Sequence, residues 1–292
     1  MEGLPARIVI VGGRSRSGRA MREAFGTCEV IGLVRGMAGP GEIALADYRQ
    51  VPEGLDLGGA VIVNCAGAVS GSPDELMRAN CEVPLAWAQA GAAAGARQFV
   101  QISSFSLFGR QPAIGHATPL APTSAYGRSK LAAEQALAAL DTRAMAVARL
   151  RVPILVGAGT DKLARLVRLA TGTGFVPTAP WPTPRSMLSY GALADAVVRV
   201  VAQGASGALF AADPEPFTPG LLCAMAREAS LGLRPLVVPR PVLGLLARAA
   251  PGLHASLFLP NLLEERDNLL AQGTNGECLR AAMVRMFAKA RP

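Results

Sequence analysis

The sequence predicts a doubly wound α/β protein with a parallel sheet and a smaller C-terminal lobe, and three observations lead to this fold class. Short runs of β-branched and apolar residues alternate with Ala- and Leu-rich stretches of helical length, which is typical of strands covered on both faces by crossover helices. A glycine-rich turn follows the first of these runs. The chain of 292 residues is 51% hydrophobic and 17% charged, so it can form a large core and does not have the composition of a disordered protein.

The first half of the chain contains strands and helices in alternating order. We expect strands at Arg7–Val11, Glu29–Val34, Ala60–Asn64, Gln98–Ser103 and Ala146–Leu150. We expect helices at Arg16–Phe25, Ser72–Gly95 and Ser124–Leu140. Their residues favour helix formation, and Gly follows several of them where a C-terminal cap is expected. Right-handed crossovers then make a doubly wound sheet the simplest topology.

The pattern becomes less regular after Gly157. We expect, in order, a helix at Asp161–Thr171, a Pro-rich loop rather than a strand over residues 175–185, a helix at Leu193–Ala202, a late strand at Ala208–Ala211, a helix at Pro219–Leu231 and a mixed apolar tail. The sequence therefore predicts a dinucleotide-binding domain over residues 1–157. Residues 158–292 are expected to form a substrate-binding lobe that is interleaved with the sheet through the late strand.

The turn after the first strand has the residues of a dinucleotide-binding site. It reads Gly12-Gly13-Arg14-Ser15-Arg16-Ser17-Gly18 and precedes a helix. Gly12 and Gly18 hold the outer places of a G-x-x-G-x-x-G spacing, and Ser15 holds the middle place. Such a turn lets the backbone approach a pyrophosphate at the helix N-terminus, so Gly12, Arg14, Ser15 and Gly18 are the expected contacts. An ordinary glycine-containing turn is the alternative interpretation.

Two arginines indicate which nicotinamide cofactor is preferred. Arg35 follows the second strand, where an NAD site would carry Asp or Glu for the ribose 2′-hydroxyl. Arg14 can make a second contact to a 2′-phosphate. The pair favours NADP(H), with NAD(H) as the alternative, unless both arginines are simply solvated. Asp47 is expected near the adenine amino group.

The strongest catalytic pattern consists of Ser104, Tyr126 and Lys130. Tyr126 and Lys130 are four residues apart on one helix face, so the ammonium can lie near the phenol and lower its pKa toward neutrality. Such a tyrosine can exchange a proton with a carbonyl or alcohol oxygen during hydride transfer. Ser104, at the end of the fourth strand, can hydrogen-bond the same oxygen. The alternative is an ordinary amphipathic helix.

Composition restricts the partners and the location. The net charge of +8 favours anionic partners, but neither a Lys-rich patch nor an aromatic RNA-binding signature accompanies it, so we expect no nucleic acid. No apolar run is long enough to span a membrane. Five scattered cysteines and the lack of a signal-peptide pattern predict a reduced, cytoplasmic protein. Two distant histidines predict no metal site.

The chain resembles an extended short-chain dehydrogenase/reductase of the NAD-dependent epimerase/dehydratase family. Besides the glycine turn and Tyr126-Gly127-Arg128-Ser129-Lys130, the segments that carry the resemblance are Asn64-Cys65-Ala66-Gly67, Asn80, residues 99–104, Leu107-Phe108-Gly109 and residues 151–157. The resemblance implies a Rossmann-type fold, with Tyr126 and Ser104 as catalytic residues and Lys130 as a ribose-binding residue. It further implies cofactor contacts from Asn64, Ala66, Gly67, Asn80, Pro153 and Ile154, and a substrate-diphosphate contact from Arg185. A homodimer through residues 72–95 and 124–140 is also implied.

Members of the family mostly act on nucleotide-activated sugars. Three functions remain open for this chain. The NADP-type arginine pair favours NADPH-dependent reduction of a keto group on a nucleotide sugar or a related keto compound, with Tyr126 as proton donor. An NAD-dependent nucleotide-sugar 4-epimerase is the alternative. The third is a non-catalytic, cofactor-binding structural subunit, which Ser15 favours and the Ser104, Tyr126 and Lys130 set opposes. No acid pair follows Ser103, which disfavours a sugar 4,6-dehydratase.

Overall fold

The computed structural model describes residues 3–142, 144–157 and 161–289. These residues divide into two compact units. The first unit comprises residues 1–109, 119–152 and 193–211, and the second comprises residues 110–118, 153–192 and 212–292. The domain boundary expected between residues 157 and 158 adjoins residues 158–160, which lie outside the described residues.

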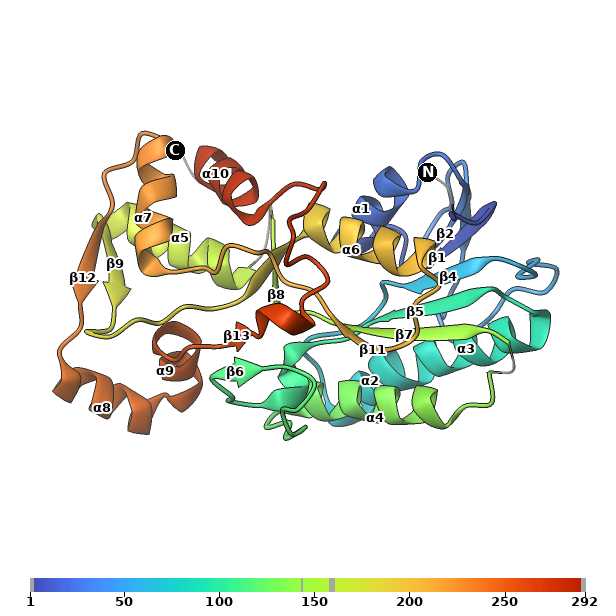
Figure 1. The fold of residues 1–292 in the computed structure, drawn as a ribbon, viewed down its shortest axis with the longest axis horizontal. Helices are drawn as coiled ribbons and strands as arrows, with labels where there is room; N and C mark the ends of the chain where they lie inside the picture. Colours follow the sequence, from blue (N-terminus) through green and yellow to red (C-terminus); the bar gives the residue numbers. More distant parts are fainter. Residues whose placement is uncertain (1–2, 143, 158–160, 290–292) are drawn as a thin grey trace. The chain divides into compact units, whose positions relative to one another are not determined.

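The first unit is built on a seven-stranded sheet in which all neighbouring strands are parallel (Figure 1). Its strand order is β11-β7-β5-β4-β1-β2-β3. The strands are β1 (Arg7–Val11), β2 (Glu29–Val34), β3 (Glu42–Ala44), β4 (Val61–Asn64), β5 (Gln98–Ile102), β7 (Ala146–Arg151) and β11 (Gly207–Phe210). Every expected strand of this sheet is confirmed to within one residue at each end, and β3 is additional. The strand order reverses between β1 and β4, where doubly wound sheets bind their ligands.

Helices cover both faces of this sheet (Figure 1). On one face lie α1 (Arg16–Ala24) and the part of α6 (Tyr190–Ala202) that belongs to the unit, and on the other lie α2 (Pro73–Met77), α3 (Val83–Ala94) and α4 (Ala125–Ala139). A short π-helix, η1 (Arg78–Glu82), joins α2 to α3, so the helix expected over residues 72–95 changes its hydrogen-bonding pattern midway. Fully buried side chains such as Val9, Ile62, Trp87 and Phe99 form the core between the sheet and α3.

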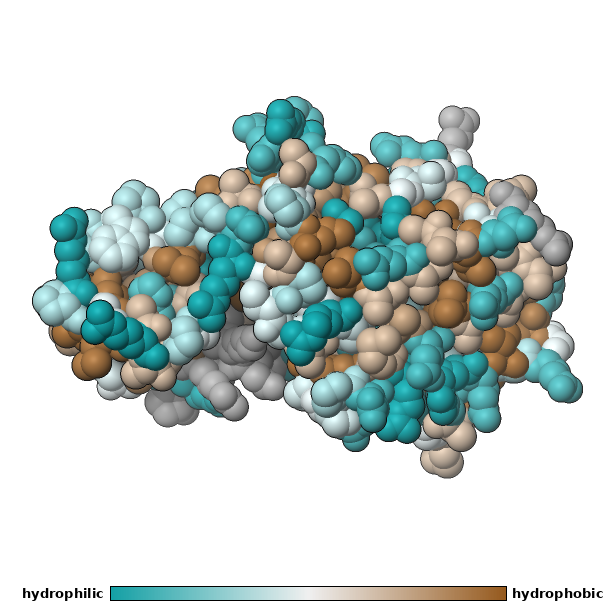
Figure 2. Space-filling view, turned by 90° about the horizontal axis from the view of Figure 1, so that it is seen from below, coloured by the Kyte–Doolittle hydropathy of each residue, from teal (hydrophilic) through white to brown (hydrophobic). Residues whose placement is uncertain are grey.

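The expected homodimer would form through the face that α2, α3 and α4 present. Hydrophobic and hydrophilic residues are interspersed over it (Figure 2). Among the described residues of these helices, the large hydrophobic side chain that is exposed is Met77, at 37%. The surface of these helices is therefore made mainly of small and polar residues, and the dimer stays a prediction.

The second unit is assembled from small sheets and helices. Among the described residues its three two-stranded parallel sheets pair β10 (Met187–Ser189) with β8 (Ile154–Val156), β12 (Arg234–Val237) with β9 (Phe175–Thr178) and β13 (Leu262–Leu263) with β6 (Ala113–Ile114). Its helices include α5 (Asp161–Thr173), α7 (Pro219–Glu228) and α10 (Leu279–Lys289), as expected for the first two. Val176, Leu222, Met283 and Phe287 belong to the core that these elements share.

The expectation that residues 175–185 form only a loop is wrong, because Phe175–Thr178 forms strand β9. Its partner β12 lies in the part of the chain that was expected to be a mixed apolar tail. Arg234 N donates to the oxygen of Gly174 at 3.0 Å, and Val238 N donates to the oxygen of Thr178 at 2.9 Å. Pro177 lies between these two bonded positions. In this parallel pairing its backbone nitrogen points away from β12, so the missing N–H does not remove a hydrogen bond between the two strands.

The apolar stretch from Leu236 to Leu263 forms short elements. After β12 come α8 (Arg240–Ala249), α9 (Pro251–Phe258) and β13. Pro239 is the N-cap of α8, and Pro251 occupies the first turn of α9, where proline favours a helix start. No helix in the described ranges is both long and apolar enough to cross a membrane.

Candidate functional site

The expected site residues of the first unit lie around the carboxyl ends of its strands. Gly12 follows β1, Asn64 ends β4, and Ser104 comes two residues after β5. These ends lie at one edge of the sheet, since Val11 pairs with Asn64 and Asn64 pairs with Gln101. The N-terminal turns of α4 bring Tyr126 and Lys130 to the same edge.

The turn between β1 and α1 has a conformation that requires glycine. Gly12 has a φ of 81°, and a Cβ at this position would lie 2.9 Å from the backbone nitrogen of Ala66. Ser15, in the place of the middle glycine, is the N-cap of α1 and accepts a hydrogen bond from Gly18 N at 3.0 Å. The turn thus leads directly into a helix N-terminus, which suits a pyrophosphate. Contacts of Gly12, Ser15 and Gly18 with a cofactor stay a prediction.

The loop after β4 is held by two buried asparagines. Asn64 donates to Gln101 Oε1 at 2.8 Å and accepts from Ala66 N at 3.1 Å. Asn80, in η1, accepts from Ala68 N at 3.0 Å and donates both to Ala68 O at 2.8 Å and to Ser129 Oγ at 3.0 Å. Asn80 therefore ties the loop to α4, so its side chain positions the expected cofactor contacts Ala66 and Gly67.

Gly67 lies where this loop approaches the catalytic helix. A Cβ built on Gly67 would lie 2.7 Å from Asn80 Oδ1 and 3.6 Å from Lys130 Nζ. A Cβ at this position would displace the Asn80 carboxamide, whereas its contact with the Lys130 ammonium would be an ordinary van der Waals contact. The absence of a side chain at Gly67 keeps the backbone of the β4 loop close to the Lys130 ammonium.

The side chains of Ser104 and Tyr126 interact with each other. Ser104 is the N-cap of the 3₁₀ helix η2 (Phe105–Phe108), and its hydroxyl accepts from Ser106 N at 3.1 Å. The same hydroxyl donates to Ser106 Oγ at 3.1 Å, and it also interacts with the Tyr126 phenol and lowers its pKa. Burial nevertheless raises the pKa of Tyr126 above its usual value, and the Ser104 interaction lowers it only in part. The expected lowering of the Tyr126 pKa by Lys130 is thus not found in this structure.

The reason lies in the position of the Lys130 ammonium. Lys130 Nζ donates to the backbone oxygen of Ile102 at 3.1 Å, and the side chain is only 6% exposed. Burial lowers the pKa of Lys130 to about 8, although the charge of Glu134 opposes this shift. Burial also raises the pKa of the neighbouring Cys65 thiol to about 12, so Cys65 contributes no negative charge at neutral pH.

Sequence reasoning missed a buried ion pair behind these residues. Arg151 at the end of β7 makes a bidentate pair with Glu134 of α4, with a shortest distance of 2.7 Å from Nη2 to Oε2. Ser103 Oγ donates to the same carboxylate at 2.5 Å. The Arg151 guanidinium also lies 5.4 Å from the ring centres of both Phe108 and Phe210. The only sequence signal for this pair was the position of Glu134 four residues after Lys130.

A cavity of about 330 Å³ lies beside the end of β2. Its lining includes Arg35, Asp47, Tyr48, Arg49, Arg78 and Val83. The Arg35 guanidinium lies 5.6 Å from the centre of the Tyr48 ring, and Asp47 accepts from Arg49 Nη2 at 2.6 Å. The Arg49 bonds hold the pKa of Asp47 below its usual value. The cavity, the glycine turn and the buried Lys130 together fit an elongated ligand such as a nicotinamide dinucleotide.

Arg14 does not lie free at the glycine turn as a 2′-phosphate site would require. Its Nη2 lies 2.5 Å from Glu42 Oε2, and its Nε lies 3.1 Å from the same oxygen. The sequence argument for NADP(H) used Arg14 and Arg35 together, and Arg14 is already engaged by a carboxylate. Glu42 was not among the expected site residues, because it belongs to β3, which the sequence did not reveal.

The expected site residues of the second unit are placed as follows. Pro153 is buried and Ile154, in β8, is 36% exposed. Arg185 Nη1 donates to the oxygens of Ala255 at 2.8 Å and Leu259 at 2.7 Å, at the C-terminal end of α9. Burial lowers the pKa of Arg185. The guanidinium therefore stabilises a helix C-terminus, and its contact with a substrate diphosphate stays a prediction.

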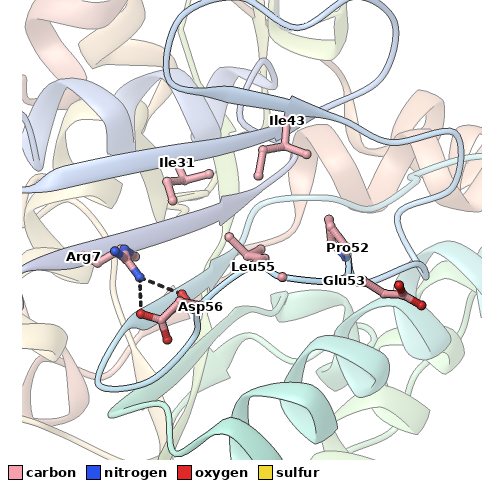
Figure 3. Close-up of a pocket in the computed structure, with 8 residues that line it drawn as sticks. Arg7, Ile31, Ile43, Pro52, Glu53, Leu55 and Asp56 are labelled. Atoms are coloured by element: carbon pink, nitrogen blue, oxygen red, sulfur yellow. Dashed lines mark hydrogen bonds and ion pairs between the residues drawn. The ribbon is translucent and has the colours of Figure 1, made fainter.

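A second cavity, of about 400 Å³, is found elsewhere in the first unit (Figure 3). Ile31 and Ile43 extend from β2 and β3 toward Leu55 across it. Its cation, Arg7, lies 2.8 Å from a carboxylate oxygen of Asp56 and is therefore already paired. None of the expected site residues lines this cavity, so we do not assign it to the site. In the described part of the chain, no group of three or more His, Cys, Asp or Glu side chains is arranged to hold a metal ion.

Comparison with solved structures shows how widely this fold is shared. A UDP-glucuronic acid 4-epimerase from Bacillus cereus in complex with NAD has a TM-score of 0.72 at 13% identity, covering 97% of this chain and 96% of that one. A short-chain dehydrogenase/reductase superfamily protein from Agrobacterium tumefaciens with bound NAD has a TM-score of 0.74 at 18% identity, covering 98% and 97%. The Bordetella bronchiseptica enzyme WbmG in complex with NAD and UDP has a TM-score of 0.71 at 18% identity, covering 97% and 94%.

Sequence comparison assigns the family. No curated protein sequence matches the chain. The model of the NAD dependent epimerase/dehydratase family matches residues 8–208, which is more than half of the chain and includes the glycine turn, Ser104, Tyr126 and Lys130. The resemblance seen in the sequence and the doubly wound fold are both confirmed. The chain therefore belongs to the NAD-dependent epimerase/dehydratase family of enzymes and has a Rossmann-type fold.

Proposed function

We propose that the chain catalyses hydride transfer between a bound nicotinamide dinucleotide and a carbon that carries a hydroxyl or keto group in a nucleotide sugar. The observation that carries this proposal is the placement of Ser104, Tyr126 and Lys130 at one edge of the sheet, next to the glycine turn. The nucleotide-sugar class is supported by similar structures that are described as a UDP-glucuronic acid 4-epimerase and as a complex with UDP.

The chain's own groups supply proton transfer and orientation. A bound nicotinamide would accept or return the hydride. The Tyr126 hydroxyl donates a proton to the substrate oxygen on reduction and takes one on oxidation, while the Ser104 hydroxyl hydrogen-bonds and orients that oxygen. The Lys130 ammonium offers hydrogen-bond donors to ribose hydroxyls of the dinucleotide.

Two reactions fit this arrangement, and they differ in the cofactor. Exposed Arg35 at the end of β2 favours NADPH and a net reduction. The engagement of Arg14 by Glu42 favours NAD, and so do the similar structures that hold NAD. We therefore propose NAD-dependent 4-epimerisation first, because an epimerase returns the hydride to its own substrate and needs no NADPH supply. NADPH-dependent reduction of a keto sugar is the second candidate.

The test begins with what the gently purified protein retains. Mass spectrometry of the released ligands is expected to detect NAD(H) and a nucleotide sugar. A titration with NADH and then with NADPH, followed by nicotinamide fluorescence, is expected to show binding of at least one of them. If the purified protein retains no dinucleotide and neither NADH nor NADPH binds to it, the enzymatic proposal is wrong. Incubation with UDP-sugars and product separation then distinguishes epimerisation, which leaves the total cofactor redox state unchanged, from reduction, which consumes NADPH.

Two variants of α4 connect the activity to the site. Tyr126→Phe is expected to bind the dinucleotide and to lose turnover. Arg128→Gln removes an exposed side chain from the same helix and is expected to keep both properties. Turnover in Tyr126→Phe at the rate of the Arg128→Gln control would show that the proton donor lies elsewhere.

A further inference from the structure

The Glu42 carboxylate, beside the glycine turn, is bonded by two arginines and one backbone nitrogen. It accepts from Arg14 of the turn, from Arg22 Nη1 of α1 at 2.5 Å and from the backbone nitrogen of Gly39 at 3.0 Å. Its side chain is only 7% exposed, whereas that of Arg14 is 47% exposed. One fixed carboxylate therefore determines the direction of the Arg14 side chain.

The position of Glu42 in the sheet explains why it reaches the turn. Glu42 begins β3 and pairs with Gly32 of β2. Because Gly32 has no side chain, the space above it is open to the Glu42 side chain, and a Cβ at Gly32 would lie 3.6 Å from Glu42 Cγ. The carboxylate thus extends from the outermost strand across β2 to Arg14. The family pattern places an acid directly after β2, where this chain has Arg35, so Glu42 supplies a carboxylate from a different strand.

We propose that Glu42 sets the cofactor preference of the chain, favouring NAD over NADP by holding Arg14 away from a 2′-phosphate. This inference rests on the proposed function, because it assumes that the glycine turn binds a nicotinamide dinucleotide. A 2′-phosphate bound to Arg14 would compete with Glu42 for the guanidinium and would lie close to the negative charge of the Glu42 carboxylate. Repulsion between these two like charges disfavours the NADP complex.

Glu42 is ionised at every pH at which dinucleotide binding would be measured. The bonds from Arg14, Gly39 and Arg22 lower the pKa of Glu42 to about 2. The preference for NAD is therefore expected to be constant from about pH 7.5 to pH 9, where both Glu42 and a 2′-phosphate with a second pKa of about 6 are fully ionised.

The experiment compares the dissociation constants of NADH and NADPH in the wild type and in Glu42→Gln. Glutamine retains the size and can still accept from Gly39 N and Arg22, but it no longer holds Arg14 by charge. We expect the ratio of NADPH to NADH affinity to rise by about tenfold or more, which corresponds to about 1.4 kcal/mol. In Glu42→Gln/Arg14→Gln the gain is expected to disappear, because the released guanidinium is what binds the phosphate.

Glu29→Gln is the matched control. Glu29 lies at the opposite end of β2, and it too pairs with an arginine, Arg7, at 2.8 Å. Its substitution removes the same charge from the same sheet without touching the turn, so the affinity ratio should stay at the wild-type value. Circular dichroism and urea unfolding establish that each variant is folded.

The outcomes separate the inference from the proposed function. A wild type that binds neither dinucleotide overturns both. A wild type that binds NADH, together with a Glu42→Gln variant whose affinity ratio is unchanged or equals that of Glu29→Gln, overturns the inference alone. A wild type that already prefers NADPH also overturns it. A rise in Glu42→Gln that is lost in the double variant supports it.

Discussion

Replacement of Lys130 by methionine is expected to make the ligand-free protein more stable while it abolishes turnover. The Lys130 ammonium is buried, and its direct hydrogen-bond partner is the backbone oxygen of Ile102. That oxygen also accepts from Gln101 Nε2 at 2.9 Å, so it keeps a donor in the variant. Glu134 likewise keeps its bonds from Arg151 and Ser103. The substitution therefore removes a costly buried charge without leaving a buried polar group unpaired.

The magnitude follows from the pKa of Lys130. It is lowered from its ordinary value of 10.5 to about 8. At about 1.4 kcal/mol per pKa unit, this difference amounts to about 3 kcal/mol of lost stability. A lowered lysine pKa has its full cost below pH 8, where Lys130 is charged in both the folded and the unfolded state. The cost decreases between pH 8 and pH 10.5, because the folded state loses the proton first. The gain in Lys130→Met is thus expected to be about 2–3 kcal/mol at pH 7 and about 1 kcal/mol at pH 9.5.

Urea unfolding at these two pH values measures the effect. Arg128→Met serves as the control, because it removes an exposed cation from the same helix and should change the free energy of unfolding by less than about 0.5 kcal/mol. If Lys130→Met were less stable than the wild type at pH 7, or if its gain were equal at both pH values, the burial cost assigned to Lys130 would be wrong.

Three further substitutions test other parts of the site. Arg151→Leu leaves Glu134 buried without its bidentate partner and should lower the free energy of unfolding by about 3–5 kcal/mol in urea titrations; a loss below about 1 kcal/mol would contradict the buried pair. Tyr126→Phe should reduce turnover by about 10²–10⁴-fold in a sugar-conversion assay with little change in NADH affinity, and an equal loss of affinity would point to a binding role instead. Gly12→Ala forces a Cβ toward Ala66 at a positive φ, so NADH binding measured by fluorescence should be lost together with about 1–3 kcal/mol of stability, whereas unchanged binding would mean that the turn is not the pyrophosphate site.

The sheet of the first unit was predictable because its signals are local. Most of its strands contain a short run of apolar residues, such as residues 8–11 or 61–63, that needs no distant partner to be recognised. The caps are local as well, since Ser15 and Ser124 each accept from a backbone nitrogen three residues later. Parallel pairing and right-handed crossovers then leave few topologies open.

Features that depend on distant pairs could not be predicted in the same way. Strand β9 contains Pro177 and is recognisable only with its partner β12, which follows almost 60 positions later. Glu42 and Arg14 are both ordinary surface residue types, and only the pairing of β3 with β2 brings them together. The bonds of Arg185 to the carbonyl oxygens at the end of α9 could not be predicted either, because they join residues about 70 positions apart. A sequence shows that such a residue is charged, but it does not show which other residue forms an ion pair or hydrogen bond with it.

The pairing of charges at the carboxyl edge indicates where a ligand would bind. Arg14 is paired with Glu42, Arg49 with Asp47 and Arg151 with Glu134. Two other cations of this edge have uncharged direct partners in the described structure: Lys130 bonds to a backbone oxygen, and Arg35 lies over the Tyr48 ring. Lys130 lies one helical turn after Tyr126 in α4, and Arg35 lines the cavity at the end of β2. A buried ammonium with a single carbonyl partner is a stability cost that a protein retains at a functional site. A long, polar ligand that reaches from the cavity past the glycine turn to Lys130 would supply the missing acceptors at both ends, as a dinucleotide does.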